Sequence, residues 1–255
     1  SGGLSEDWTY RRYRDEDIWA FQPLRKPAVP EGAAHPVDAF IGRRLNAAHV
    51  PGAPAAHFRT LVKRAYYDLT GLPPTPFEIY RFRLAWDKDP DRAWRELVDK
   101  LLASPHYGER WGQHWLDVAR YADTNGGGFD YVYPTAWRYR DYVVRALNLD
   151  IPYNSFLVEQ LAGDLLPETD DETRAIERKL ATGMLALAPK GLGMQDKELM
   201  AMDVVDDQID VLGRSLMGLT LACARCHDHK FDPVLTADYY ALAGIFRSTV
   251  SLSDL

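Results

Sequence analysis

Two cysteines, Cys223 and Cys226, are the only ones in this chain of 255 residues, and His227 follows the second directly. A spacing of two residues places both thiols on one turn of the backbone, with the imidazole beside them. Two such thiols can add to the two vinyl groups of a porphyrin while the imidazole binds the iron from the same side. The segment therefore predicts a covalently attached c-type haem with His227 as an iron ligand.

Two other chemistries use the same residue types. Zinc suits a set made of Cys223, Cys226, His227 and His229, but these four ligands lie within seven residues and no second pair completes a usual zinc finger. A thioredoxin-like dithiol requires a strand before the cysteines, whereas the pattern before Cys223 is helical. Haem attachment is favoured over both alternatives.

Composition excludes several classes of function. The formal net charge is -7, which leaves no basic footprint for nucleic acid. No apolar run reaches the length of a membrane span. The hydrophobic fraction of 46% and the charged fraction of 26% are typical of a globular protein.

The hydrophobic spacing predicts a mainly α fold: an irregular multi-helix domain with an extended N-terminal arm and the haem site near the C-terminus. Repeated prolines predict that residues 1–35 form the arm. Apolar residues three and four apart then predict a single α-helical haem domain over residues 36–255. Thr75, Pro76 and Glu78 predict a capped helix start, and Asp89 and Pro90 predict another. Further helices are expected at 106–122, 135–147, 197–221 and 236–245.

The second axial ligand of the iron decides between electron transfer and catalysis. His114 is the first candidate, because its helix face also carries Trp111, Val118 and Tyr121 and is predicted to be buried; a core histidine is the alternative. His229 is expected to contact a haem propionate or a neighbouring loop. Thioether candidates, which are more often packing residues, are Met184, Met194, Met200, Met202 and Met217.

A second constellation consists of Arg120, Trp137, Arg138 and Arg140. Arginines pair bidentately with carboxylates, so Arg120 and Arg140 are candidate propionate partners. Arg138, Trp137 and Tyr133, with Tyr131, are candidates for a catalytic cleft, in which the arginines could also bind an acidic or sulfated sugar. The alternative is a set of intrachain ion pairs with Asp117, Asp123 and Asp141.

Two acidic groups have weaker interpretations. Asp123, Asn125 and Asp130 flank three glycines and could hold Ca²⁺, although their spacing is not that of an EF-hand. Asp203, Asp206, Asp207 and Asp210 are predicted to form a solvated helix face. Asp207 or Asp210 could also orient the His227 imidazole.

The longer motifs resemble the planctomycete cytochrome-associated domain family. They are CARCHDHKFDP (223–233), DYYALAGIF (238–246), WAFQP (19–23), DLTGLPP (68–74), SPHYGERW (104–111), HWLDVARYAD (114–123), AWRYRD (136–141) and QLAGD (160–164). The resemblance implies an exported, periplasmic or cell-surface multidomain protein that also carries a small cytochrome c domain and lectin-like modules. Residues 125–133 depart from the more charged loop of many relatives, which weakens any inference of a shared substrate.

Three functions are compatible with these observations. The first is electron transfer between a small cytochrome c partner and another domain or acceptor, with two protein ligands on the iron. The second is a haem-dependent oxidoreductase that acts on an exported substrate such as a polysaccharide, with an open iron face beside Trp137 and Arg138. The third is a binding module in which the haem is a structural staple. The sequence favours the first.

Overall fold

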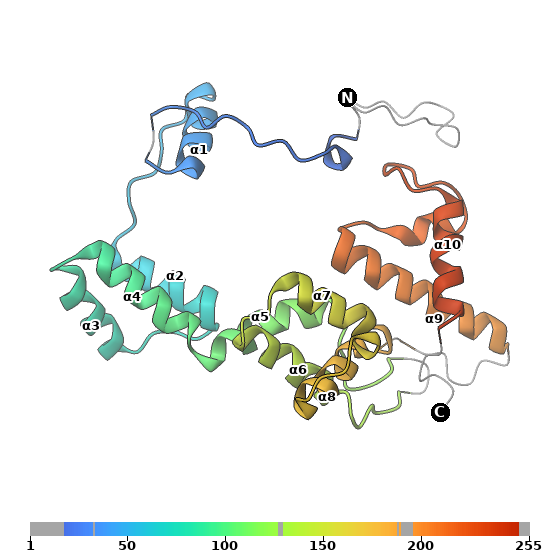
Figure 1. Ribbon diagram of the computed structural model, residues 1–255. Coiled ribbons are helices and arrows are strands. Elements are labelled where there is room, and N and C mark those ends of the chain that lie inside the picture. The colour runs from blue at the N-terminus through green and yellow to red at the C-terminus, as the bar shows by residue number, and fades with distance from the viewer. Residues whose placement is uncertain (1–17, 33, 127–129, 188, 190–195, 250–255) are drawn as a thin grey trace.

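The computed structural model describes residues 18–32, 34–126, 130–187, 189 and 196–249, and Figure 1 shows their arrangement. Within these ranges the fold consists of α-helices without a strand, and one isolated antiparallel bridge joins Thr124 to Val132. The predicted mainly α fold is confirmed. The α-helices are α1 (Pro36–Ala47), α2 (Phe58–Thr70), α3 (Pro76–Trp86), α4 (Pro90–Leu102), α5 (Pro105–Val118), α6 (Trp137–Asn148), α7 (Tyr153–Ala162), α8 (Glu172–Ala181), α9 (Lys197–Leu212) and α10 (Thr236–Arg247). Shorter turns are the 3₁₀ helices η2 (Trp19–Phe21), η3 (Gly163–Leu165), η4 (Thr182–Leu185) and η6 (Leu221–Arg225), and the π turn η5 (Gly213–Met217).

The segment before α1 is irregular. In its described part, residues 18–32 and 34–35, only η2 has regular hydrogen bonding. The helical part of the chain begins at Pro36, where the His35 imidazole accepts a hydrogen bond from the backbone N–H of Val37.

Three hydrophobic clusters follow one another along the chain, and Figure 1 shows the helices that carry them succeeding one another across the view. The first joins α2, α3 and α4 around Val62 and Phe82. The second joins α5 to α8 around Tyr142 and Met184, and the third joins α9, η6 and α10 around Tyr239. The cysteine pair therefore belongs to a different cluster from α5 and α6.

Local helix signals are confirmed. Thr75 and Glu78 form a reciprocal capping box at the start of α3, and the Asp89 side chain accepts a hydrogen bond from the Arg92 backbone at the start of α4. Gly71 ends α2 in the left-handed region with φ +70°, which a residue without Cβ adopts at no steric cost.

Helices α5 and α6 approach each other closely because α5 presents glycines. A Cβ on Gly108 would overlap the backbone oxygen of Val144 and the side chain of Asn148. The Asn148 amide joins the two helices, accepting from the Gly108 N–H at 2.8 Å and donating to the Pro105 carbonyl at 3.0 Å. The second cluster is built on this contact.

Helices α7 and α8, which the sequence pattern did not reveal, are joined by buried charges. Glu159 and Glu177 are each 3% exposed, and both accept hydrogen bonds from Arg174. The Tyr142 hydroxyl donates to Glu159 at 2.8 Å, and Arg145 pairs with Glu177 at 2.6 Å. Each buried carboxylate thus has a cationic partner, which buried charges require.

The predicted helix 197–221 is wrong at its C-terminal end. α9 stops at Leu212 and continues as the π turn η5, after which Gly218 adopts φ +66° and reverses the chain. Gly213 lies against Leu219 and Leu221, where a Cβ would come within 2.9 Å of the Leu219 oxygen. This close packing folds the η6 segment back onto α9 and places the cysteine pair.

Candidate functional site

The cysteine pair lies on the surface of the third cluster. Leu221 and Ala224 are buried and anchor the turn η6, while Cys223 and Cys226 are exposed and form no disulfide. The turn therefore holds its apolar residues inward and both thiols outward. This is the orientation that a thiol must have to react with a group brought from outside.

Arg225 fixes this turn to the rest of the fold. Its guanidinium donates to the Asp206 carboxylate on α9 at 3.1 Å, and the Tyr239 hydroxyl on α10 donates to the other Asp206 oxygen at 2.6 Å. The Tyr240 hydroxyl donates to the Arg225 carbonyl at 3.1 Å. Arg225, the second of the two residues between the cysteines, is thus held by both helices of the cluster.

The charges of this group act on one another. Burial lowers the pKa of Arg225, but the attraction of Asp206 and its hydrogen bond outweigh burial and raise it. Burial, assisted by Asp206, raises the pKa of the Tyr239 hydroxyl. Arg225 therefore stays charged and Tyr239 stays protonated at neutral pH. The sequence analysis missed this group, because Asp206 precedes Arg225 by 19 residues and Tyr239 follows Asp206 by 33, so no local pattern links them.

His227 is exposed beside Cys226. Its Nδ1 lies 2.9 Å from the carbonyl oxygen of Asp228, a contact in which Nδ1 carries the proton. Metal-binding imidazoles commonly donate one ring N–H to a backbone carbonyl and bind the metal through the other nitrogen. Asp228 is itself held by the Thr236 N–H at the start of α10, so the imidazole is oriented by an anchored residue.

His229 has a different role. It is 6% exposed, and its Nδ1 accepts hydrogen bonds from the backbone N–H groups of Phe231 and Asp232 at 3.3 and 2.8 Å. Its Nε2 lies 3.4 Å from the Thr220 hydroxyl. His229 therefore organises the loop that follows the motif, in line with the neighbouring loop contact expected for it.

The residues present fit a covalently attached haem. Both thiols are exposed on a single turn, and the imidazole beside them is oriented through its Nδ1. Tyr240, 52% exposed and hydrogen-bonded to the same turn, and Phe231, 63% exposed, offer apolar surface close to the motif. Zinc has less support: His229 is turned into its own loop, and the described residues contain no group of three or more His, Cys, Asp or Glu that could hold a metal ion.

Arg120 is held inside the fold. It follows α5 in the left-handed region at φ +50°, and its guanidinium forms a bidentate ion pair with Asp207 on α9 and donates to the Met184 carbonyl at 2.9 Å. Tyr133 lies with Arg120 around a small cavity of about 70 Å³, where burial and the nearby Asp207 charge raise the pKa of Tyr133. Of the expected intrachain pairs, the structure forms Arg140–Asp141, at 2.8 Å.

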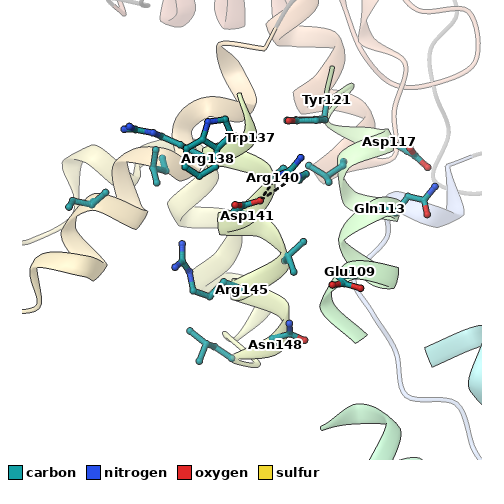
Figure 2. A pocket seen from close by; sticks show the side chains of 15 residues that line it. Glu109, Gln113, Asp117, Tyr121, Trp137, Arg138, Arg140, Asp141, Arg145 and Asn148 are labelled. Atoms are coloured by element: carbon teal, nitrogen blue, oxygen red, sulfur yellow. Dashed lines mark hydrogen bonds and ion pairs between the residues drawn. The ribbon is translucent and has the colours of Figure 1, made fainter. Parts of the chain in front are cut away.

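Trp137, Arg138 and Arg140 line a separate groove between α5, α6 and α8, with a volume of about 960 Å³ (Figure 2). The structure thus divides the second constellation. Arg120 and Tyr133 lie together, whereas the other three residues lie in the groove, and Tyr131 is exposed on the loop before α6. Neither place is on η6.

His114 does not lie on a buried face. It is exposed on α5, next to Trp111 at a ring distance of 5.6 Å, and Trp111 and Val118 are exposed as well. The expected burial of this face is wrong: Tyr121 is partly buried against the second cluster, but no neighbouring element of the described chain covers Trp111, His114 or Val118. Among the methionines, Met184 is fully buried in the second cluster and Met217 is 54% exposed, while Met194 lies outside the described residues.

The expected calcium ligands are occupied by intrachain hydrogen bonds. Asp123 accepts from the Tyr121 hydroxyl at 2.6 Å, Asn125 from the Tyr131 N–H at 3.1 Å and Asp130 from the Gly126 N–H at 3.1 Å. These oxygens shape the loop between α5 and α6, which is the structural role the contacts support.

The sequence predicts that the acids of α9 form a solvated face, but the structure shows that they pair with other side chains. Asp206 binds Arg225 and Tyr239, Asp207 binds Arg120, and Asp210 pairs with Arg214 at 2.8 Å. Asp203 lies 3.8 Å from Arg225. Their partners come mostly from distant segments, which a one-helix pattern does not reveal.

Comparisons with known proteins give one match. Residues 36–251 match the model of the family PSCyt2, protein of unknown function (DUF1549). No curated protein and no solved structure matches the chain. The family model covers most of the chain and confirms the resemblance drawn from the motifs, so the chain belongs to the PSCyt2 family of planctomycete cytochrome-associated domains.

Proposed function

We propose that this domain is a c-type haem redox protein that transfers electrons between a small cytochrome c partner and another domain or acceptor. One observation carries the proposal: both cysteines of the chain are exposed on one anchored turn, and the imidazole of the next residue is oriented through its Nδ1. When bound, a haem supplies one-electron chemistry at its iron.

In this proposal the residues of the chain have distinct roles. Cys223 and Cys226 would form the two thioether links, and His227 would bind the iron. Arg225 and Asp206 hold the turn that carries all three, through a contact of 3.1 Å. Because the thiols and the imidazole are exposed, the macrocycle would be attached at the surface, close to partners that exchange electrons.

Electron transfer is preferred over the oxidoreductase alternative for a structural reason. That alternative predicts an open iron face beside a cleft lined by Arg138, Trp137, Tyr131 or Tyr133. Trp137 and Arg138 lie on α6, which belongs to the second cluster, whereas the motif lies on η6 in the third. Figure 1 shows α6 apart from α10, onto which η6 packs.

The test is expression with the cytochrome c maturation machinery, followed by absorption spectra and acid extraction. We expect haem bands that remain with the protein after extraction, since thioether links resist it. The double variant Cys223→Ala, Cys226→Ala should lose covalent haem. His227→Ala should change the spectrum, whereas His114→Ala, the matched change on α5, should not. Absence of covalent haem in the unaltered chain contradicts the proposal.

Carbon monoxide separates the two redox functions. An electron carrier with two protein ligands on the iron should show no Soret shift when the reduced protein is exposed to CO. A clear shift would replace electron transfer by the oxidoreductase alternative. A redox-silent iron in a potentiometric titration would instead favour the structural staple.

The proposal includes an exported location, periplasmic or at the cell surface. Its support is the family resemblance, which associates such domains with exported multidomain proteins. No helix among the described residues is long and apolar enough to cross a membrane. Immunoblotting of fractionated cells that make the native protein tests the location, and recovery in the cytoplasmic fraction alone would contradict it.

A further inference from the structure

The groove between α5, α6 and α8 has the size and the lining of a ligand site, and it lies away from the cysteine-bearing turn. Its volume of about 960 Å³ is at the upper end of the range of small-molecule sites, about 300–1,000 Å³. Figure 2 shows α6 along its middle, with Trp137 and Tyr121 at one end, the Arg140–Asp141 pair at the centre, and Asn148 and Glu109 at the other end. The twelve residues of α6 make it about 18 Å long, so an extended ligand fits best.

The groove contains apolar surface that is exposed in the described part of the chain. Leu149 is 61% exposed, Ile176 is 54% exposed and Trp137 is 46% exposed, and all three line it. Leu116 and Leu180, which are partly buried, line the groove as well. Apolar floors with a few polar groups around them are typical of binding sites.

Several polar groups of the groove have hydrogen-bonding capacity left. Among the described residues, the side chains of Gln113 and Asp117 have no hydrogen-bond or ion-pair partner, and Arg138 makes only a contact with the Trp137 ring, at 5.6 Å. Together they offer an amide, a carboxylate and a guanidinium. Burial, assisted by Asp123, raises the pKa of Tyr121 to about 12, so its hydroxyl remains neutral. The groove can therefore both donate to and accept from one ligand.

The charges of the lining cancel. Arg138, Arg140 and Arg145 carry three positive charges, and Glu109, Asp117 and Asp141 carry three negative ones. Two of the arginines are already paired, Arg140 with Asp141 and Arg145 with Glu177. A charged ligand therefore gains little long-range attraction, whereas a neutral ligand with many hydroxyls can use both donors and acceptors.

We propose that this groove binds a neutral oligosaccharide, in a site independent of the cysteine motif. Sugar rings present C–H faces for Trp137, Leu149 and Ile176, and hydroxyls for the polar groups around them. An extended peptide is less suited, because it gains affinity by adding a strand to a sheet edge and this groove is walled by helices, whose backbone groups are already bonded. The proposal does not rest on haem binding and can fail or succeed separately from it.

The test is calorimetric titration of the folded chain with neutral hexasaccharides of β-1,4-glucan, β-1,3-glucan, α-1,4-glucan and β-1,4-mannan. Oligogalacturonate and a sulfated galactan oligosaccharide serve as charged counterparts. We expect at least one neutral member to bind, with a negative heat-capacity change from buried apolar surface, and the charged counterparts to bind more weakly.

Trp137→Ala should weaken this binding by about threefold to tenfold, the value of one aromatic contact. The matched control is Trp111→Ala, because Trp111 on α5 is exposed to a similar extent, 42%, but does not line the groove. Gln113→Ala, on the opposite wall, gives a second groove variant should Trp137→Ala unfold. Binding of charged members alone, no binding by any neutral member, or equal losses in the Trp137 and Trp111 variants would each overturn the proposal.

Discussion

Arg225, which directly precedes Cys226, donates to the carboxylate of Asp206 on α9 at 3.1 Å. The same carboxylate accepts from the Tyr239 hydroxyl at 2.6 Å. One carboxylate thus joins η6, α9 and α10. The motif turn owes its position to this contact as well as to the burial of Leu221 and Ala224.

Replacing this carboxylate should destabilise the third cluster. Asp206→Asn leaves Arg225 with the more distant Asp203 carboxylate, at 3.8 Å, as its charged partner. Because hydrogen bonds to charged groups contribute about 1.5–3 kcal/mol, we expect the free energy of unfolding to fall by about 2 kcal/mol. Asp210→Asn, on the same helix, removes an i,i+4 pair with a 60% exposed Arg214 and should cost less than about 1 kcal/mol. Urea denaturation measures both. Equal losses would show that Asp206 has no special structural role.

Glu78 should make the first cluster sensitive to acid. Burial alone would raise the pKa of Glu78, but hydrogen bonds from Lys100, Tyr66 and Thr75 lower it to about 2. This stabilisation is fully present above the unfolded pKa, about 4.3, and is lost as the pH falls from there towards 2. Glu78→Gln should therefore lose about 1 kcal/mol at pH 7 and show a smaller further loss between pH 5 and 2 in urea titrations. Glu96→Gln, in an exposed pair with Arg92, should keep the pH profile of the unaltered chain.

The close approach of α5 and α6 predicts that one added methyl group at Gly108 destabilises the fold. Gly108→Ala places a Cβ into the Val144 carbonyl oxygen, and such overpacking typically costs about 1–3 kcal/mol. Gly244→Ala in α10 meets nothing within 4 Å and should be neutral or stabilising by about 0.5–1 kcal/mol, since alanine favours the helix. Thermal unfolding followed by circular dichroism compares the two. A Gly108→Ala protein as stable as Gly244→Ala would disprove the close packing.

The largest effect is expected at Arg174. Its removal leaves two carboxylates, each 3% exposed, with fewer cationic contacts, and breaking a buried pair costs about 3–5 kcal/mol. Arg174→Ala should therefore unfold at much lower guanidinium concentration than the unaltered chain. Arg214→Ala, in an exposed pair, serves as the control and should remain within about 1 kcal/mol of it. Similar midpoints for both variants would show that the contacts of Arg174 with Glu159 and Glu177 contribute no more to stability than an exposed ion pair.

Local signals predicted what depends on neighbouring residues. The capping box at Thr75 and the start of α4 at Asp89 both follow from residues within one turn, and the structure has them. The motif spacing likewise predicted that both thiols lie on one turn, and in the structure both are exposed there. No long-range information is needed for any of these features.

Such local patterns do not predict which distant segments supply the ion-pair and packing partners of a helix. α7 and α8 turn Glu159, Glu177 and Arg174 inward, so the spacing of apolar residues alone does not reveal these two helices. His114 shares its face with Trp111 and Val118, yet this apolar face is left exposed. In both cases burial was decided by the assembly of helices rather than by residue type.

Asp206 and Asp207 are consecutive, and consecutive residues of an α-helix point about 100° apart around its axis. One carboxylate reaches Arg225 in the motif turn and the other reaches Arg120 at the end of α5. α9 thus connects the motif turn to the end of α5 through one ion pair on each side of the helix. Any displacement of the motif turn relative to the α5–α8 body must therefore break one of these two ion pairs, so the two parts of the molecule resist shear.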